Sequence, residues 1–200
     1  MFKNLRIHDT IRDLLDKRSP QSIDDGRFDY VHSAVLIPLF KDNGEVKVLL
    51  TKRSTSVEYH KGQISLPGGA VEEEDDSFME TALRETHEEI GLLKKDVTVL
   101  GQIDDRLTLV SNFLIHPFVG TFPYPYDFKI NSDEVHSLIK VPLDLFISTD
   151  SIEEIADIEF GGKIYNGPVF RYKGEVIWGA TAGIMKNFVE ILGPSLTSNK

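Results

Sequence analysis

The sequence contains no cysteine among its 200 residues. Disulfide bonds, zinc sites with thiolate ligands and thiol nucleophiles are therefore excluded. Basic residues are also scarce, since 22 Lys and Arg stand against 32 Asp and Glu and give a formal net charge of -10. A charge of this sign argues against tight binding to the phosphate backbone of nucleic acids, so no nucleic-acid partner is expected.

Long apolar runs are absent as well. The sequence has no run of the roughly 18 apolar residues that a membrane span requires, so no membrane association is expected. Its first residues lead into an amphipathic segment rather than an apolar signal core, and the last three are not a peroxisomal address. A hydrophobic content of 40% allows a substantial core, and we expect a cytoplasmic protein.

Acidic residues, in contrast, are concentrated in one stretch. Nine Asp and Glu lie between positions 72 and 89, where Arg84 is the only Lys or Arg. On a helix, the spacing of Glu85, Glu88 and Glu89 would place them on one face, where like charges repel. A hard divalent cation with oxygen ligands is the natural partner for such a face. The alternative is a solvated charged helix, but such a helix would interleave Lys with Glu.

Signals at both ends predict a helix over this stretch. Ser77 and Glu80 form a capping box that can satisfy orphan amides at the start. Gly91 suits a C-terminal cap. A separate apolar stripe completes an amphipathic pattern, and it comprises Met79, Ala82, Leu83, Thr86 and Ile90.

The acidic helix and the glycines before it resemble the Nudix box. This box is the loop-helix-loop signature of hydrolases that act on a nucleoside diphosphate linked to another group, with the spacing G-x5-E-x7-R-E-U-x-E-E-x-G-U, where U is bulky and apolar. The match runs through Gly69-x5-Asp75 and Arg84-Glu85-x2-Glu88-Glu89-x-Gly91. Asp75 replaces the first Glu, and Thr86 replaces the first U. Eight residues rather than seven separate Asp75 from Arg84. The extra residue resembles the coenzyme A pyrophosphatase branch of the family.

Residues on both sides of the box resemble the same branch. The branch motif L-L-T-x-R-S-x3-R-x3-G-x3-F-P-G-G matches residues 49–69 in spacing, with Glu58 in place of Arg and Leu66 in place of Phe. The downstream segments P-F-V-G, N-x-x-E-V, V-P-L and I-W-G-x-T-A match residues 117–120, 131–135, 141–143 and 177–182. The resemblance runs from about Val31 to Leu192.

The resemblance implies roles for the residues of the box. Glu85 and Glu89 would be the principal ligands of Mg²⁺ or Mn²⁺. Glu88 would be a third ligand, or would instead form an ion pair with a nearby Lys or Arg. Such cations neutralise a diphosphate, orient it and activate water. Arg84 would fix the loop by pairing with Asp75 or a box glutamate, with direct substrate contact as the alternative.

The general base is open among three glutamates. Glu134, in the N-x-x-E-V segment, matches a loop glutamate that serves as base in some members of the superfamily. It could instead begin a strand with a solvated side chain. Glu88 and Glu89, acting on a metal-bound water, are equal candidates.

Four residues are candidates for substrate contact. Gly68 and Gly69 would let the backbone approach a ligand closely, although a plain turn after Pro67 is the alternative. Arg53 carries a guanidinium fork that suits phosphate, although it could be a surface charge. His60 is a further candidate, but a lone His is more often structural.

These features favour hydrolysis of coenzyme A or its derivatives to 3′,5′-ADP and a 4′-phosphopantetheine product. Glu58 in place of Arg favours an alternative, in which the small-molecule substrate is ADP-ribose or another nucleoside diphosphate derivative. A third interpretation is a non-catalytic nucleotide-binding module, although such a module need not retain three crowded acids.

The resemblance implies an α/β fold, a Nudix-type α/β/α sandwich with a mixed sheet, and the alternation of elements along the chain agrees. Besides the acidic helix, helices are predicted over 2–17 and 185–192. Strands are predicted over 31–39, 46–52, 63–66, 97–103, 112–122, 134–141, 168–172 and 175–178. We expect one domain over 1–200, with a helical N-terminal extension (1–30) and a core (31–192). The assembly state is open, with a homodimer as one alternative.

Overall fold

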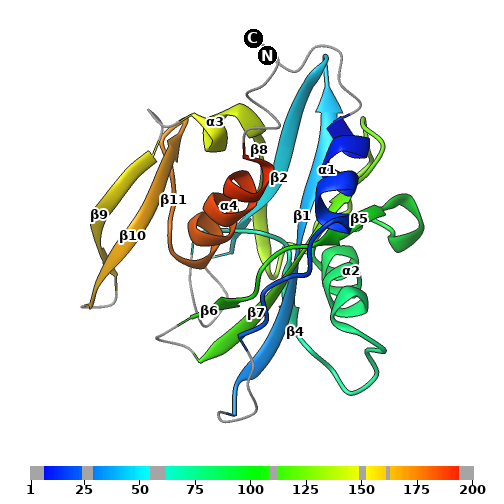
Figure 1. Ribbon diagram of the computed structural model, residues 1–200, viewed down its shortest axis with the longest axis horizontal. Helices are drawn as coiled ribbons and strands as arrows, with labels where there is room; N and C mark the ends of the chain where they lie inside the picture. Colours follow the sequence, from blue (N-terminus) through cyan, green and yellow to red (C-terminus); the bar gives the residue numbers. More distant parts are fainter. Residues whose placement is uncertain are drawn as a thin grey trace.

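The structure of the protein is a computed structural model, which describes residues 7–23, 29–54, 62–108, 112–148, 152–160 and 163–193. Within this part of the chain, eight strands form a mixed sheet (Figure 1). Its main path is β3 (Ile64–Ser65), β2 (Glu45–Arg53), β1 (Val31–Asp42), β7 (Phe113–Thr121) and β5 (Thr98–Gln102). Off this path, β4 (Gly68–Ala70) pairs with β1, β6 (Arg106–Leu107) with β7, and β8 (Val135–Pro142) with β2.

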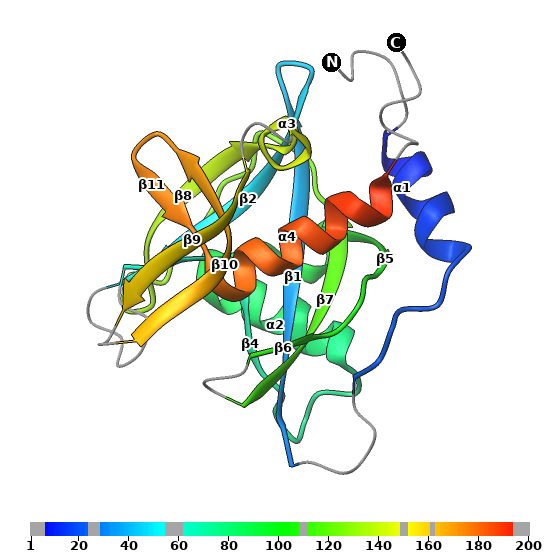
Figure 2. The same ribbon diagram turned by 60° about the vertical axis from the view of Figure 1, so that its left-hand side comes forward.

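The central strand β1 is parallel to β7 and antiparallel to β2. Helices α2 (Phe78–Ile90) and α4 (Gly179–Leu192) cover opposite faces of the sheet (Figure 2). Ala34 and Leu36 of β1 face the α2 side, whereas Ile37 and Leu39 face the side of α4. A strand buried on both faces reads as a nearly continuous apolar run, which is why residues 31–39 could be predicted as a strand. The expected mixed sheet between helices is confirmed.

The predicted N-terminal helix is present as α1 (Ile7–Asp16), and it packs on the chain's own core. Its buried residues are Ile7, Ile11 and Leu15. Leu15 lies against Gly101 of β5 so closely that a Cβ at Gly101 would be 2.8 Å from the Leu15 Cβ. None of the described helices combines the length and apolar character that a membrane span requires.

A second, antiparallel sheet contains β9 (Ile152–Phe160), β10 (Lys163–Tyr172) and β11 (Glu175–Ile177), and it extends to one side of the main sheet (Figure 1). The predicted hairpin through Lys173 and Gly174 joins β10 to β11. Strand β9 and the first half of β10 were not predicted. The sequence of β9 is rich in Asp and Glu, which are depleted in strands, so this strand is defined by its pairing with β10.

Two helices differ from the prediction. The short helix α3 (Leu143–Ile147) was not predicted. It follows directly from β8 and has no side-chain cap. Helix α4 begins at Gly179, six residues before the predicted start at Met185. Its N-cap residue, Trp178, makes no side-chain capping bond, and a Gly or Thr in the first turn is a poor helix former. The early start is supported by a tertiary bond instead, because the Thr181 hydroxyl donates to the Ile64 carbonyl at 3.1 Å.

A buried polar cluster joins β7 to the start of α2. The ring of His116 stacks on Phe78, with centroids 3.7 Å apart, and its Nδ1 lies 2.8 Å from Oδ1 of Asp105. The other carboxylate oxygen of Asp105 accepts the N–H of Ile23 at 3.3 Å. Burial by itself would raise the pKa of Asp105, but the His116 contact and the Ile23 N–H outweigh it, and the pKa lies below its usual value.

This cluster predicts an acid-dependent contribution to stability. The lowered pKa means that ionised Asp105 stabilises the folded state above its unfolded pKa of about 3.9, and that the contribution is lost as pH falls through the lower folded value. We expect Asp105→Asn to lower the free energy of unfolding by about 1–2 kcal/mol at pH 7. Urea titrations at pH 7 and pH 3 should show this difference shrinking in acid. If Asp105→Asn lowered the free energy of unfolding equally at both pH values, ionised Asp105 would not be the stabilising group.

Candidate active site

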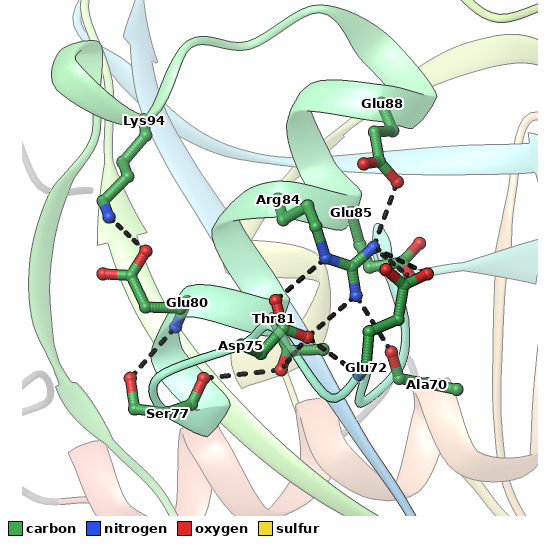
Figure 3. Close-up of polar contacts among 10 residues, drawn as sticks. All are labelled: Ala70, Glu72, Asp75, Ser77, Glu80, Thr81, Arg84, Glu85, Glu88 and Lys94. Carbon is green, nitrogen blue, oxygen red and sulfur yellow. Dashed lines mark hydrogen bonds and ion pairs between the residues drawn. The ribbon is translucent and has the colours of Figure 1, made fainter.

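The acidic helix has the predicted boundaries as α2. The Ser77 side chain accepts the N–H of Glu80 at 3.3 Å, and Gly91 ends the helix in the left-handed conformation with φ of 71°. Two details correct the prediction. The Glu80 carboxylate pairs with Lys94 on the outer surface (Figure 3), so it does not complete the capping box. Met79 is 36% exposed because it lies outside the face that packs on β1.

Arg84 makes polar contacts with several residues of the loop before α2 and of α2 itself (Figure 3). Its Nε and Nη2 each bond an oxygen of Asp75 at 2.9 Å, and Nη2 also donates to the Ala70 carbonyl at 3.1 Å. Its Nη1 lies 2.9 Å from Oε1 of Glu85 and 3.1 Å from Oε2 of Glu88. The predicted pairing of Arg84 with Asp75 and box glutamates is therefore present. A planar guanidinium with five donors is well suited to so many acceptors.

Asp75 closes the loop that leads into α2. Its Oδ2 accepts the hydroxyl of Thr81 at 2.8 Å and the N–H of Glu72 at 3.0 Å, in addition to Arg84. The bidentate contact with Arg84 is the main reason why the pKa of Asp75 lies well below its usual value. Thr81 was not predicted to take part. Its position one turn after Ser77 could have indicated a contact with the loop, because the first turn of α2 faces the loop.

The loop anchor predicts a stability loss on neutralisation. We expect Asp75→Asn to lower the free energy of unfolding by about 1–3 kcal/mol, because an amide cannot accept both Arg84 nitrogens and the Glu72 N–H. Urea unfolding measures the change. Asp76→Asn is the matched control, since Asp76 is exposed and should change stability by less than about 0.5 kcal/mol. Equal losses in the two variants would mean that net charge, rather than the anchor, is responsible.

The two glycines of β4 lie directly against the acidic face of α2. A Cβ on Gly69 would come within 2.4 Å of the Glu85 carboxyl carbon. Gly68 has φ of +149°, and a Cβ there would lie 2.3 Å from the Ala34 carbonyl oxygen. The N–H of Gly68 hydrogen-bonds the Glu89 carboxylate. These contacts favour the close approach of backbone and carboxylate over the alternative of a plain turn, because a residue with a Cβ could not come this close.

Glu89 is buried and Glu85 is partly buried, and the pKa values of both carboxylates are raised. Burial raises the pKa of Glu89 to about 8, against the opposing charge of Arg53. Burial also raises the pKa of Glu85, although Arg84 opposes the shift. Oε2 of Glu89 is buried and has no hydrogen-bond partner among the described residues. An unpaired buried carboxylate oxygen is costly, so Glu89 is arranged for a positively charged partner, whereas Glu85 already contacts Arg84.

Arg53 and Glu134 lie beside this pair. Arg53 ends β2 opposite Val135 of β8, and its charge lowers the pKa of Glu89. Glu134 lies in the turn before β8, and its charge raises the pKa of both Glu85 and Glu89. Predicted residues from β2, β4, α2 and the turn before β8 thus meet at one place. His60 and Glu58 lie outside the described residues.

The residues of this site fit a divalent cation only in part. Glu85 and Glu89 supply hard oxygen ligands, one of them with an unpartnered oxygen, next to the glycine backbone. Glu88, the third predicted ligand, is turned toward Arg84 and its side chain is 51% exposed. Among the described residues, no three His, Cys, Asp or Glu side chains converge as a complete ligand set. The positive charge of Arg84 explains the direction of Glu88, because Arg84 Nη1 holds the Glu88 carboxylate at 3.1 Å, away from the buried Glu89.

The fold is that of Nudix hydrolases of known structure. The Ap4A hydrolase of C. elegans, in a binary complex, superposes with a TM-score of 0.54 over 84% of this chain and 98% of that chain, at 16% identity. A Nudix hydrolase from Alicyclobacillus acidocaldarius gives a TM-score of 0.55 over 88% of this chain and 98% of that chain, at 17% identity. At these identities the likeness shows the fold alone.

Sequence relatives extend the likeness to the family. The NUDIX domain family matches residues 31–156. An uncharacterized Nudix hydrolase, NudL of Yersinia enterocolitica, is 36% identical over 159 residues, which cover 80% of each chain. The mitochondrial Nudix hydrolase 15 of Arabidopsis thaliana is 38% identical over 176 residues, which cover 84% of this chain and 60% of that protein. The chain therefore belongs to the Nudix family, as a pyrophosphohydrolase of a substrate built on a nucleoside diphosphate.

Members of this family generally use divalent metal ions. The non-catalytic binding module considered from the sequence is set aside by the assignment to this family of hydrolases.

Proposed function

We propose that this enzyme hydrolyses the diphosphate bond of coenzyme A or its derivatives, with Mg²⁺ or Mn²⁺, to 3′,5′-ADP and a 4′-phosphopantetheine product. The observation that carries this substrate is the resemblance of residues 49–69 to the motif L-L-T-x-R-S-x3-R-x3-G-x3-F-P-G-G, which they match in spacing, with Glu58 in place of Arg and Leu66 in place of Phe. Its first part is strand β2, and its last two glycines are those of β4. The motif therefore brackets the site, with Arg53 at one end and Gly69 at the other.

Arg53 is the residue that we propose for binding a substrate phosphate. It lies next to the buried Glu89 charge, and its Nε is buried without a hydrogen-bond partner in the described part of the chain. Since an unsatisfied guanidinium nitrogen is costly, a phosphate oxygen is a suitable acceptor. Gly68 and Gly69 would let the same diphosphate approach the backbone, and His60 is a further candidate for phosphate contact.

We propose Glu85 and Glu89 as the principal ligands of the cation, with Glu88 as a third ligand that gives up its bond to Arg84. When bound, the cation supplies positive charge that neutralises the diphosphate oxygens and activates water. Arg84 keeps the loop and the Glu85 carboxylate in place through its contacts with Asp75 and Ala70. In this proposal Arg84 acts on the box rather than on the substrate.

Glu134 is the residue that we propose as general base. Glu88 and Glu89 are both proposed as ligands of the cation, and Glu89 is buried. Glu134 comes from a different element, and its charge acts on both Glu85 and Glu89. In the reaction, a water oxygen forms a bond to phosphorus while the bridging phosphorus–oxygen bond breaks. The carboxylate of Glu134 accepts the proton of the water, and the two phosphate products separate.

The test is chromatographic identification of products after incubation with coenzyme A or ADP-ribose, with Mg²⁺, Mn²⁺ or chelator. We expect metal-dependent release of 3′,5′-ADP from coenzyme A. Cleavage of ADP-ribose alone would overturn the proposed substrate and leave the family assignment intact.

ADP-ribose is the second candidate because Glu58 replaces the Arg of the motif. If this position contacts the substrate, Glu58→Arg should increase cleavage of coenzyme A relative to ADP-ribose.

A further inference from the structure

A short segment packs across the C-terminal end of α2. In this segment, residues 129–134, the N–H of Lys129 donates to the Ile90 carbonyl at 3.0 Å and the N–H of Asn131 to the Glu89 carbonyl at 2.9 Å. The last carbonyls of a helix have no intrahelical partner, so these bonds tie the segment to the residue that carries the buried carboxylate. Gly91 permits the close approach, because a Cβ there would lie 2.7 Å from the Lys129 Cβ.

Asn131 also organises the turn that follows. Its carbonyl accepts the N–H of Glu134 at 3.2 Å and of Val135 at 2.9 Å. Its side-chain Oδ1 accepts the N–H of Asp133 at 3.2 Å. Its Nδ2 donates to Oε1 of Glu134 at 3.3 Å. One residue thus contacts the backbone of Glu89 on one side and the carboxylate of Glu134 on the other.

The backbone of Glu134 is also held from the side of β2. Its carbonyl accepts the N–H of Ser54 at 2.8 Å, next to Arg53. A glutamate side chain nevertheless retains considerable rotamer freedom, so a fixed backbone does not fix the carboxylate. The Asn131 amide supplies that restraint, and the bond uses only Oε1 of the carboxylate.

We propose that Asn131 is a positioning residue, which holds the Glu134 carboxylate beside Glu85 and Glu89 of α2 for proton transfer from water. This inference rests on the proposed role of Glu134 as general base. Fixing a base within reach of its proton is a contribution to the rate of the chemical step rather than to substrate binding.

Two variants of Asn131 test the proposal. Asn131→Asp keeps the oxygen that accepts the Asp133 N–H but loses the donor to Glu134, and Asn131→Ala removes the donor without adding a charge. We expect each variant to lower kcat about 10-fold, while KM changes less than about twofold. Mn²⁺ affinity and melting temperature, measured by calorimetry, should stay close to those of the parent. Asp133→Ala is the matched control, because it keeps the backbone N–H and should leave kcat unchanged.

A double-mutant cycle with Glu134→Gln decides whether Asn131 acts through Glu134. We expect no further loss of kcat when Asn131→Ala is added to Glu134→Gln. Equal losses in both backgrounds would overturn the proposal, as would a lower melting temperature with an unchanged kcat of the folded fraction. Full turnover by Glu134→Gln would show that the proposed base is wrong and would remove the role of Asn131 with it. An impaired Glu134→Gln enzyme with fully active Asn131 variants would overturn the Asn131 proposal alone.

Discussion

Replacing Glu85 or Glu89 by Gln is expected to lower turnover by about 10²–10³-fold while the protein remains folded. Glu89 is buried and Glu85 is partly buried against Gly69 of β4, and an amide would supply neither their charge nor an equivalent hard ligand. A loss of this size corresponds to several kcal/mol of transition-state stabilisation, which is what a catalytic cation contributes. Steady-state kinetics at saturating Mg²⁺ and at saturating Mn²⁺ measure it.

Stability separates this effect from misfolding. Burying the Glu89 charge raises its pKa, so the metal-free Glu89→Gln variant should be at least as stable as the metal-free parent. Glu80→Gln is the control for a changed charge on the same helix, because Glu80 pairs with Lys94 away from the glycines. The interpretation would be wrong if Glu80→Gln lost as much activity, or if the Glu85 and Glu89 variants kept full turnover.

Gly69→Ala is expected to abolish most activity without unfolding the protein. The added Cβ would lie 2.4 Å from the Glu85 carboxyl carbon, which is far shorter than van der Waals contact, so the carboxylate must move. A displacement of about 1 Å in a catalytic group can lower the rate about 10²-fold. The backbone of Gly69 does not itself require a positive φ, so the fold should accept alanine. The measurement is kcat with a melting temperature on the same preparation.

Alanine substitutions at two other glycines serve as comparisons for Gly69→Ala. Gly167→Ala should be neutral, because nothing lies within 4 Å of a Cβ at that position. Gly68→Ala should instead destabilise the fold, since its Cβ would collide with the backbone of Ala34 at a positive φ. Gly69→Ala with normal kcat would show that the Glu85 carboxylate does not need its observed place.

The sequence allowed α2 and the placement of its acidic residues to be predicted because their signals are local. Ser77 and Gly91 mark the ends of the helix by their own backbone preferences, and the spacing of Glu85, Glu88 and Glu89 follows from helical geometry. The meeting of Arg53 with Glu89 and Glu134 was implied by resemblance rather than by periodicity, because these residues come from three different elements.

The remaining features depend on contacts that no local pattern announces. The pairing of β9 with β10 and the contact of His116 with Asp105 join neighbouring segments of the chain. The early start of α4 at Gly179 is supported by the bond from Thr181 to Ile64, which is distant in the sequence. The sequence left the role of Glu88 open between a metal ligand and an ion pair with a nearby Lys or Arg, and the structure has the ion pair with Arg84. The sequence alone could not decide, because Arg84 has several acidic neighbours. Asn131 was part of a recognised segment, but its reach to Glu134 is visible only once that turn is folded.

The most direct test is a Mn²⁺ titration followed by electron paramagnetic resonance, on the parent enzyme and on the Glu85→Gln, Glu89→Gln and Glu80→Gln variants. We expect the parent and Glu80→Gln to bind Mn²⁺ alike, and the Glu85 and Glu89 variants to bind it at least about 10-fold more weakly, as expected when a ligand of a hard cation is lost. Equal Mn²⁺ affinity in all four proteins would show that the acidic face of α2 does not hold the cation and would contradict the central claim.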